Sequence, residues 1–181
     1  MQNGTLLDSK KFNLTLTRLC FQLIENHNDF KNTVIIGLQP RGINLASRLL
    51  KELKSIKPEI NIQYGDLDVT FFRDDYRHQD TPLLAKETNI DFLVENKRVV
   101  LVDDVLFTGR TIRAGMDALL AFGRPQSVEL MVMVDRRFSR HLPIAADYIG
   151  IQVDTIAAEN VKVSWKEIDG KDEVILENIN D

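Results

Sequence analysis

The sequence has little cysteine and no surplus of positive charge. Its 181 residues include one cysteine, Cys20, so no disulfide can form within the chain. A protein without disulfides is typical of the reducing cytoplasm, which is the compartment we expect. The 23 Lys and Arg residues are outnumbered by 27 Asp and Glu residues, which gives a net charge of −4 at pH 7. This balance excludes a uniformly basic coat for nucleic acid, and we expect no DNA partner.

Long apolar runs, internal repeats and low-complexity tracts are also missing. The first residues, MQNGTLLDSKK, contain no apolar stretch of the signal-peptide type. No later segment approaches the roughly 20 apolar residues of a membrane span, so no membrane partner is expected. A composition of 44% hydrophobic and 28% charged residues is that of an ordinary globular protein and excludes wholesale disorder. The length favours one domain over residues 1–181.

Segments with helical spacing alternate with short apolar runs. Apolar residues recur every three or four positions in the expected helices, at 9–28, 43–53 and 110–122. Ser9 is the expected N-cap of the first of them. Apolar, β-branched runs indicate strands at 33–37, 60–72, 98–102, 128–134 and 148–153, the second with a kink at 64–66. Turns or connections are expected at 103–109 and 135–147.

This alternation predicts an α/β fold. Strands joined through helices form a mostly parallel, twisted sheet with helices on both faces. Near the C-terminus, residues 161–165 alternate apolar and polar, and the chain returns through residues 174–176, which predicts a β-hairpin. Residues 73–89 are polar and lack periodicity, and a loop of this length inside a compact chain is typical of a functional lid or of disorder.

The most informative stretch is VVLVDDVLFTGRT at residues 99–111. An apolar strand runs into Asp103 and Asp104, and residues 108–111 then open a helix. Two hydroxyls, a glycine and the free N–H groups of a helix N-terminus suit a phosphate dianion. The two acids suit the vicinal hydroxyls of a ribose, or a Mg²⁺ shared with it. An ordinary turn with capping acids is the alternative, but a cap needs only one acid, so a sugar-phosphate site is favoured.

This stretch resembles the phosphoribosyl-pyrophosphate motif of type I phosphoribosyltransferases. The longer string DDVLFTGRTIRAGMDAL, followed by GRP, is similar to the bacterial pyrimidine operon attenuation protein/uracil phosphoribosyltransferase family. The similarity continues in GLQPRG at 37–42, DVTFFRDD at 68–75, VDR at 134–136, LPI at 142–144 and DYIG at 147–150. It therefore covers nearly the whole chain.

The resemblance implies a single phosphoribosyltransferase domain with a mobile loop at about 73–89 and a hood at about 135–147. It implies the conversion of uracil and phosphoribosyl pyrophosphate to UMP and pyrophosphate, with Mg²⁺ as cofactor. Such proteins form dimers or tetramers, so a homodimer or homotetramer is expected. Family members also bind a hairpin of the pyrimidine leader mRNA.

The family pattern assigns site residues position by position. The ribose 5-phosphate site would consist of Asp103, Asp104, Val105, Thr108, Gly109, Arg110 and Thr111. Pyrophosphate would be held by Gln39, Pro40, Arg41, Gly42 and Arg73. Arg136 and Arg137 are the candidates for contact with the base, and the alternative is that they are surface or dimer residues. Asp103, Asp104 and Arg73 would be the catalytic residues, and the two acids would hold Mg²⁺ directly or indirectly.

The residues offer no covalent nucleophile, since Cys20 lies on the apolar face of the first helix and is typical of a core cysteine. The three histidines lack the spacing of a metal cluster. Catalysis is therefore expected from positioning, Mg²⁺ and electrostatic stabilisation of the departing pyrophosphate.

The RNA-binding half of the family pattern is incomplete in this sequence. Phe21 stands where the first-helix pattern has a histidine, and Ala145 and Ile151 stand where basic residues are common; Arg18 and Arg140 remain. Because each lost cation weakens phosphate binding, we favour a salvage enzyme whose RNA regulation is lost or altered. Two alternatives stay open: an RNA-binding attenuator that senses UMP or UTP, and a phosphoribosyltransferase that acts on another base.

Overall fold

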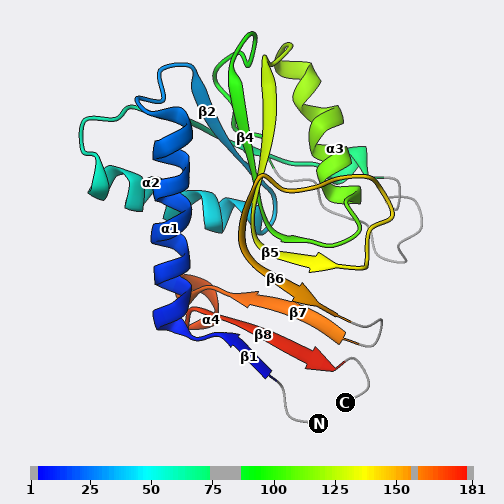
Figure 1. Cartoon of the computed structure of the whole chain (residues 1–181). Helices are drawn as coiled ribbons and strands as arrows, with labels where there is room; N and C mark the ends of the chain where they lie inside the picture. Colours follow the sequence, from blue (N-terminus) through cyan, green and yellow to red (C-terminus); the bar gives the residue numbers. More distant parts are fainter. Residues whose placement is uncertain (1–3, 74–86, 156–158, 179–181) are drawn as a thin grey trace.

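The chain forms a central five-stranded sheet, shown in Figure 1. The structure is a computed structural model that describes residues 4–73, 87–155 and 159–178. All four strand pairs of this sheet are parallel, and the strand order is β3-β2-β4-β5-β6. The strands are β2 (Thr33–Leu38), β3 (Gln63–Leu67), β4 (Arg98–Leu106), β5 (Ser127–Arg137) and β6 (Tyr148–Asp154). The central strand β4 is the predicted strand with the most continuous apolar run.

Helices cover both faces of this sheet. On one side lie α1 (Ser9–His27) and α2 (Gly42–Ile56), and on the other lies α3 (Arg110–Leu119), which continues into the short 3-10 turn η3 (Leu120–Phe122) (Figure 1). Successive side chains of β4 enter different cores because residues in a strand point alternately to opposite faces. Val100 and Val102 pack with α1 and α2, and Val99 and Leu101 pack with α3. The predicted α/β fold is confirmed.

A second, antiparallel sheet contains the C-terminal hairpin. Its order is β1-β8-β7, with β1 (Gly4–Leu7), β7 (Glu159–Ser164) and β8 (Glu173–Asn178), and α4 (Lys166–Asp169) connects the hairpin strands. The pairing of β7 with β8 confirms the predicted hairpin. Strand β1 was not predicted, because its four residues carry no periodic signal of their own. Trp165 lies fully buried at the end of β7 in an edge-to-face contact with Phe12 of α1.

Several predicted boundaries were wrong. Asp103 and Asp104 do not lie in a turn but within β4, which continues to Leu106. Strand β5 likewise extends to Arg137, into the predicted connection. In both places polar residues end the apolar run in the sequence, whereas the backbone pairing continues between β4 and β5 as far as Leu106 and Asp135.

Two further predictions fail near the first helix and the third strand. Asp8, and not Ser9, is the N-cap of α1, and its carboxylate accepts a hydrogen bond from the Lys11 N–H at 2.8 Å. The predicted kink at 64–66 is absent, since these residues pair regularly with β2. The strand ends at Leu67, and the 3-10 turn η1 (Thr70–Phe72) follows where extended backbone was expected.

Most of the predicted mobile loop, residues 74–86, lies outside the described residues. Its final residues are attached to the sheet: the Glu87 carbonyl accepts a hydrogen bond from the Gln39 side chain at 2.7 Å, and Asn89 forms a bridge with Asp66. Within the described ranges, no helix combines the length and the apolar character needed to cross a membrane.

Candidate active site

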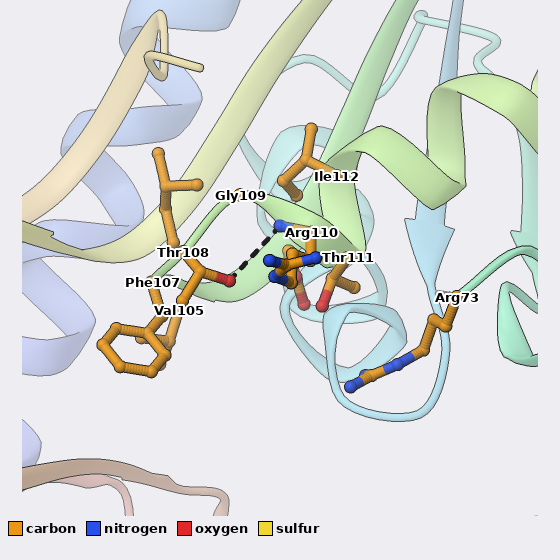
Figure 2. A pocket seen from close by; sticks show the side chains of 10 residues that line it. Arg73, Val105, Phe107, Thr108, Gly109, Arg110, Thr111 and Ile112 are labelled. Atoms are coloured by element: carbon orange, nitrogen blue, oxygen red, sulfur yellow. Dashed lines mark hydrogen bonds between the residues drawn. The ribbon is translucent and has the colours of Figure 1, made fainter. Parts of the chain in front are cut away.

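The turn from β4 into α3 forms the wall of a cavity of about 270 Å³, here called the loop cavity. Its wall includes the TGRT loop, defined as Thr108–Thr111. Gly109 is the N-cap of α3 at φ +88°, a left-handed conformation that glycine adopts without strain. Because glycine has no capping side chain, the first N–H groups of α3 are not capped by it and can bind an anion. In Figure 2 the Thr108 hydroxyl accepts a long hydrogen bond from the Arg110 N–H at 3.4 Å, and Arg73 extends toward the same cavity.

Two carboxylates lie side by side at the end of β4. Asp103 and Asp104 are only 7% and 8% exposed. Burial raises the pKa of Asp103 well above its usual range, and the neighbouring charge of Asp104 raises it further. Burial also raises the pKa of Asp104, against the opposing effect of the Arg41 guanidinium. A cation bound beside these two buried acids would stabilise their ionised forms.

The two carboxylates line different cavities. Asp103 lines the loop cavity, whereas Asp104 lines a second cavity of about 600 Å³, here called the strand cavity. Arg73, Val105 and Phe107 line both, so the cavities adjoin each other. The two acids therefore lie at the junction of the two cavities, and their predicted contact with a ribose or with a Mg²⁺ shared with it stays a prediction.

Four of the five predicted pyrophosphate residues, at 39–42, follow β2, and the fifth, Arg73, follows η1. Arg41 lines the strand cavity; its Nε donates to Asp104 Oδ2 at 3.0 Å, and its guanidinium also bonds the Val163 carbonyl. Gly42 touches β4 directly, because a Cβ placed there would lie 2.2 Å from the Val102 carbonyl oxygen and 2.9 Å from the Asp103 Cα. This close approach brings Arg41 to Asp104. The Gln39 side chain is turned toward residue 87, and Pro40 is exposed.

The strand cavity contains residues that sequence reasoning missed. Phe107 is 44% exposed at the boundary of the two cavities, and the Arg136 guanidinium lies 4.0 Å from its ring centroid. Opposite them, residues 160–163 of β7 form one wall. An aromatic residue between the acids and the TGRT loop was a usable local signal for Phe107. Strand β7 could not have been found this way, since it begins 48 residues after the end of the loop.

The two candidate base-binding arginines differ in position. Arg136 is buried, lines the strand cavity and donates to the Thr155 hydroxyl and the Glu159 carbonyl. Arg137 is exposed, forms an ion pair with Asp154 at 2.5 Å and is not among the described residues that line either cavity. Arg73, at the end of η1, is brought into both cavities. The structure therefore gathers Arg41, Arg73 and Arg136 around one space.

A family model for the phosphoribosyl transferase domain matches residues 2–168. The chain belongs to this family.

Curated relatives identify a subgroup of this family to which the chain is similar. The chain is 46% identical over 171 residues to a protein named bifunctional protein PyrR from Desulfosudis oleivorans, covering 94% of each chain. It is 42% identical to the bifunctional protein PyrR of Clostridioides difficile, covering 97% of this chain and 98% of the relative. Within the phosphoribosyl transferase domain family, these matches place the chain among the PyrR proteins.

Solved structures agree on the fold. A hypoxanthine phosphoribosyltransferase from Trypanosoma cruzi superposes with a TM-score of 0.73 at 13% identity, covering 97% of this chain and 96% of that one. A hypoxanthine-guanine phosphoribosyltransferase from Leishmania tarentolae, in complex with GMP, gives a TM-score of 0.72 at 14% identity, covering 98% and 97%. At these identities the similarity shows a shared fold alone.

Proposed function

We propose that this protein transfers a phosphoribosyl group from phosphoribosyl pyrophosphate to uracil and releases UMP and pyrophosphate. One observation carries the proposal: an anion-binding helix N-terminus and two buried acids adjoin a larger cavity surrounded by three arginines. The TGRT loop would bind the 5-phosphate, and Arg41 and Arg73 would neutralise the pyrophosphate. We further propose that residues 1–181 form one phosphoribosyltransferase domain that assembles as a homodimer or homotetramer.

The reaction needs no covalent intermediate in this site. The bond between C1 of the ribose and the pyrophosphate oxygen breaks with its electron pair on pyrophosphate, a bond from N1 of uracil to C1 forms, and the N1 proton is released to solvent. Positive charge develops on the sugar, where Asp103 and Asp104 would stabilise it. Cys20 supplies no nucleophile, because it is buried in the core and burial raises the pKa of its thiol to about 12. The residues of the site act by binding and orientation.

The donor set at the end of β4 fits Mg²⁺. The described residues contain no cluster of three or more His, Cys, Asp or Glu side chains that could enclose a metal. Two carboxylates are nevertheless the donor set that suits this ion, which keeps several waters and shares oxygens with substrate phosphates. Asp103 and Asp104 would hold Mg²⁺, and the bound ion would supply charge neutralisation at the leaving pyrophosphate.

The edge of β7 that faces away from β8 offers backbone groups for contact with the base. The Glu159 carbonyl accepts a hydrogen bond from Arg136, and the Val163 carbonyl accepts one from Arg41. The backbone N–H and C=O groups of alternate β7 residues therefore point away from β8. By this alternation, the N–H and C=O of Val161 also point away from β8, and Val161 lines the strand cavity. Uracil presents a carbonyl beside an N–H on its edge, which is complementary to one such backbone pair.

The test is a panel of bases offered with Mg²⁺ and phosphoribosyl pyrophosphate, with pyrophosphate release as the readout. We expect uracil to react and orotate and hypoxanthine to react at least tenfold more slowly. Preferential turnover of hypoxanthine or orotate would overturn the choice of base. No turnover with any base would overturn the enzymatic proposal itself.

Binding of leader RNA is the second candidate function, and the name of the relatives, bifunctional protein PyrR, favours it because the name implies a second activity. Two cations expected to contact RNA are engaged within the fold, since Arg18 donates to the Ile149 and Gly150 carbonyls and Arg140 is surrounded by acceptors. Filter retention of a pyrimidine leader RNA, with and without UMP, tests this function. Retention that depends on UMP, together with no uracil turnover, would make regulation the primary role.

A further inference from the structure

Arg140 belongs to the hood segment, defined as residues 135–147, and its side chain reaches the backbone just before the TGRT loop. Its side chain is 23% exposed. All three guanidinium nitrogens donate hydrogen bonds: Nε to one carbonyl at 3.0 Å, Nη1 to three carbonyls, and Nη2 to a carboxylate. The five acceptors are the carbonyls of Ile144, Leu106, Phe107 and Arg136 and the carboxylate of Asp135.

Further contacts join the same two segments. The Thr108 carbonyl accepts hydrogen bonds from the N–H groups of His141 at 3.0 Å and Leu142 at 3.2 Å. Ile144 packs against Gly109, where a Cβ would lie 3.2 Å from its side chain. Residues 140–144 of the hood segment therefore contact the TGRT loop and the strand end before it, whereas Arg136 of the same segment lines the strand cavity.

From this arrangement we infer that Arg140 is a positioning residue that orients the backbone of the TGRT loop for the 5-phosphate of the substrate. The inference rests on the proposed function. A peptide unit is planar, so fixing the Leu106 and Phe107 carbonyls fixes the directions of the Phe107 and Thr108 N–H groups. The guanidinium is planar and carries five donors in a rigid fork, so it can hold several carbonyls at once.

This role differs from the RNA contact that the sequence suggests for Arg140. A guanidinium whose three nitrogens already donate inside the fold has little capacity left for an RNA phosphate. Its loss would instead alter the geometry of the TGRT loop, and a misplacement of about 1 Å can cost about a hundredfold in rate. Loss of Arg140 should weaken the binding of ligands with a 5-phosphate and leave the binding of the free base nearly unchanged.

The experiment compares Arg140→Gln and Arg140→Lys with the wild-type protein and with Arg124→Gln, a matched loss of charge at an exposed arginine. We measure the KM for phosphoribosyl pyrophosphate, the KM for uracil, and the Kd for UMP by calorimetry. In Arg140→Gln the KM for phosphoribosyl pyrophosphate and the Kd for UMP should rise at least tenfold, and the KM for uracil should change less than threefold. Arg140→Lys should be intermediate, because it keeps the charge but not the fork.

Thermal unfolding of each variant separates positioning from loss of the fold. If Arg140→Gln does not fold, Asp135→Asn provides a second variant, because it removes the carboxylate partner of Arg140 with little change of shape. It should raise the KM for phosphoribosyl pyrophosphate and the Kd for UMP. An unchanged KM for phosphoribosyl pyrophosphate in a folded variant would overturn the inference, whether or not RNA retention falls. If the wild-type protein turns over no base, the proposed function fails, and the Kd for UMP still decides the role of Arg140. Absence of UMP binding by the wild-type protein would overturn both.

Discussion

At the scale of single residues, the adjacent acids of β4 decide what the site can bind. Asp103 and Asp104 are almost fully buried, and a buried carboxylate pair is costly unless it is protonated or paired with a cation. Arg41 compensates Asp104 at 3.0 Å, and Arg73 exerts a weaker favourable effect on Asp103. A ligand that brings a divalent cation to this pair would therefore bind more tightly than the same ligand without one.

The first prediction concerns Asp104→Asn. The amide keeps the size of the side chain but removes the charge that pairs with Arg41 and faces the developing positive charge on the sugar. We expect kcat/KM for uracil turnover to fall at least tenfold, equivalent to about 1.4 kcal/mol of transition-state stabilisation. Pyrophosphate release measures it, with Asp117→Asn on the exposed surface of α3 as the control. Turnover at the wild-type rate would remove Asp104 from the mechanism.

The second prediction concerns the pH dependence of substrate binding through Asp103. Its pKa is raised by burial and by Asp104, so it gains a proton at a higher pH than an ordinary aspartate. A protonated carboxyl binds a cation poorly, and the KM for the Mg²⁺ complex of phosphoribosyl pyrophosphate should therefore rise as pH falls. The steepest rise should lie above the usual pKa of aspartate, near 3.9. In Asp103→Asn the KM at neutral pH should be as high as that of the wild-type protein at low pH, and the rise should be lost; a profile parallel to that of the wild-type protein would contradict the assignment.

At the scale of elements, the sequence predicted what is contiguous in the chain. The TGRT loop, its acids and α3 lie within one stretch of residues, so composition alone indicated an anion site. The ends of β4 and β5 were placed wrongly because Asp103 and Asp135 are polar, although backbone pairing carries both strands past them. A hydropathy pattern does not show that a polar residue is buried because it belongs to a ligand site.

The third prediction tests the contact between α2 and β4. In Gly42→Ala the new methyl group would meet the backbone of Val102 and Asp103, which cannot move aside as a flexible side chain can. We expect a loss of about 1–3 kcal/mol in the free energy of unfolding, typical of an overpacked core, and a higher KM for phosphoribosyl pyrophosphate because Arg41 moves with the helix.

Urea denaturation and steady-state kinetics measure these two effects. Gly4→Ala is the matched control, since a Cβ at Gly4 has nothing within 4 Å. Equal behaviour of the two variants would show that the close approach of Gly42 to β4 has no energetic consequence.

At the scale of the whole molecule, the site joins segments that are far apart in sequence. The strand cavity brings together the turn after β2 and strands β4, β5 and β7 through Arg41, Asp104, Arg136 and Val163, respectively. The resemblance to a known family supplied Arg41 and Arg136 before the structure did, but no local pattern marks the β7 backbone, because any strand has the same polar groups. Which edge faces a cavity is decided by packing between sheets, which the sequence encodes only non-locally.

A buried polar cluster at the opposite end of the sheet also joins several elements, and it underlies the last prediction. His27 at the end of α1 has Nδ1 2.9 Å from the Thr33 hydroxyl, and its Nε2 lies 3.1 Å from both the Tyr148 hydroxyl and Glu129 Oε2. Burial lowers the pKa of His27, although the Glu129 charge opposes this. Burial pushes the pKa of Glu129 upward, but hydrogen bonds from Tyr148 and Arg98 give it a net decrease.

The sign of the pH effect follows from the lowered pKa of His27. Between its folded value and the ordinary value near 6.5, the unfolded chain binds more protons than the folded chain, so the free energy of unfolding falls as pH falls. Glu129 adds a further loss at lower pH, below its ordinary value near 4.3. In His27→Gln the amide still forms hydrogen bonds but does not titrate. The decrease between pH 7 and pH 5 should therefore be smaller than in the wild-type protein, and stability at pH 7.5 should fall by about 1–3 kcal/mol. Urea denaturation across this pH range measures both effects, with exposed His141→Gln as the control; parallel curves for wild-type and His27→Gln proteins would show that His27 does not couple folding to pH.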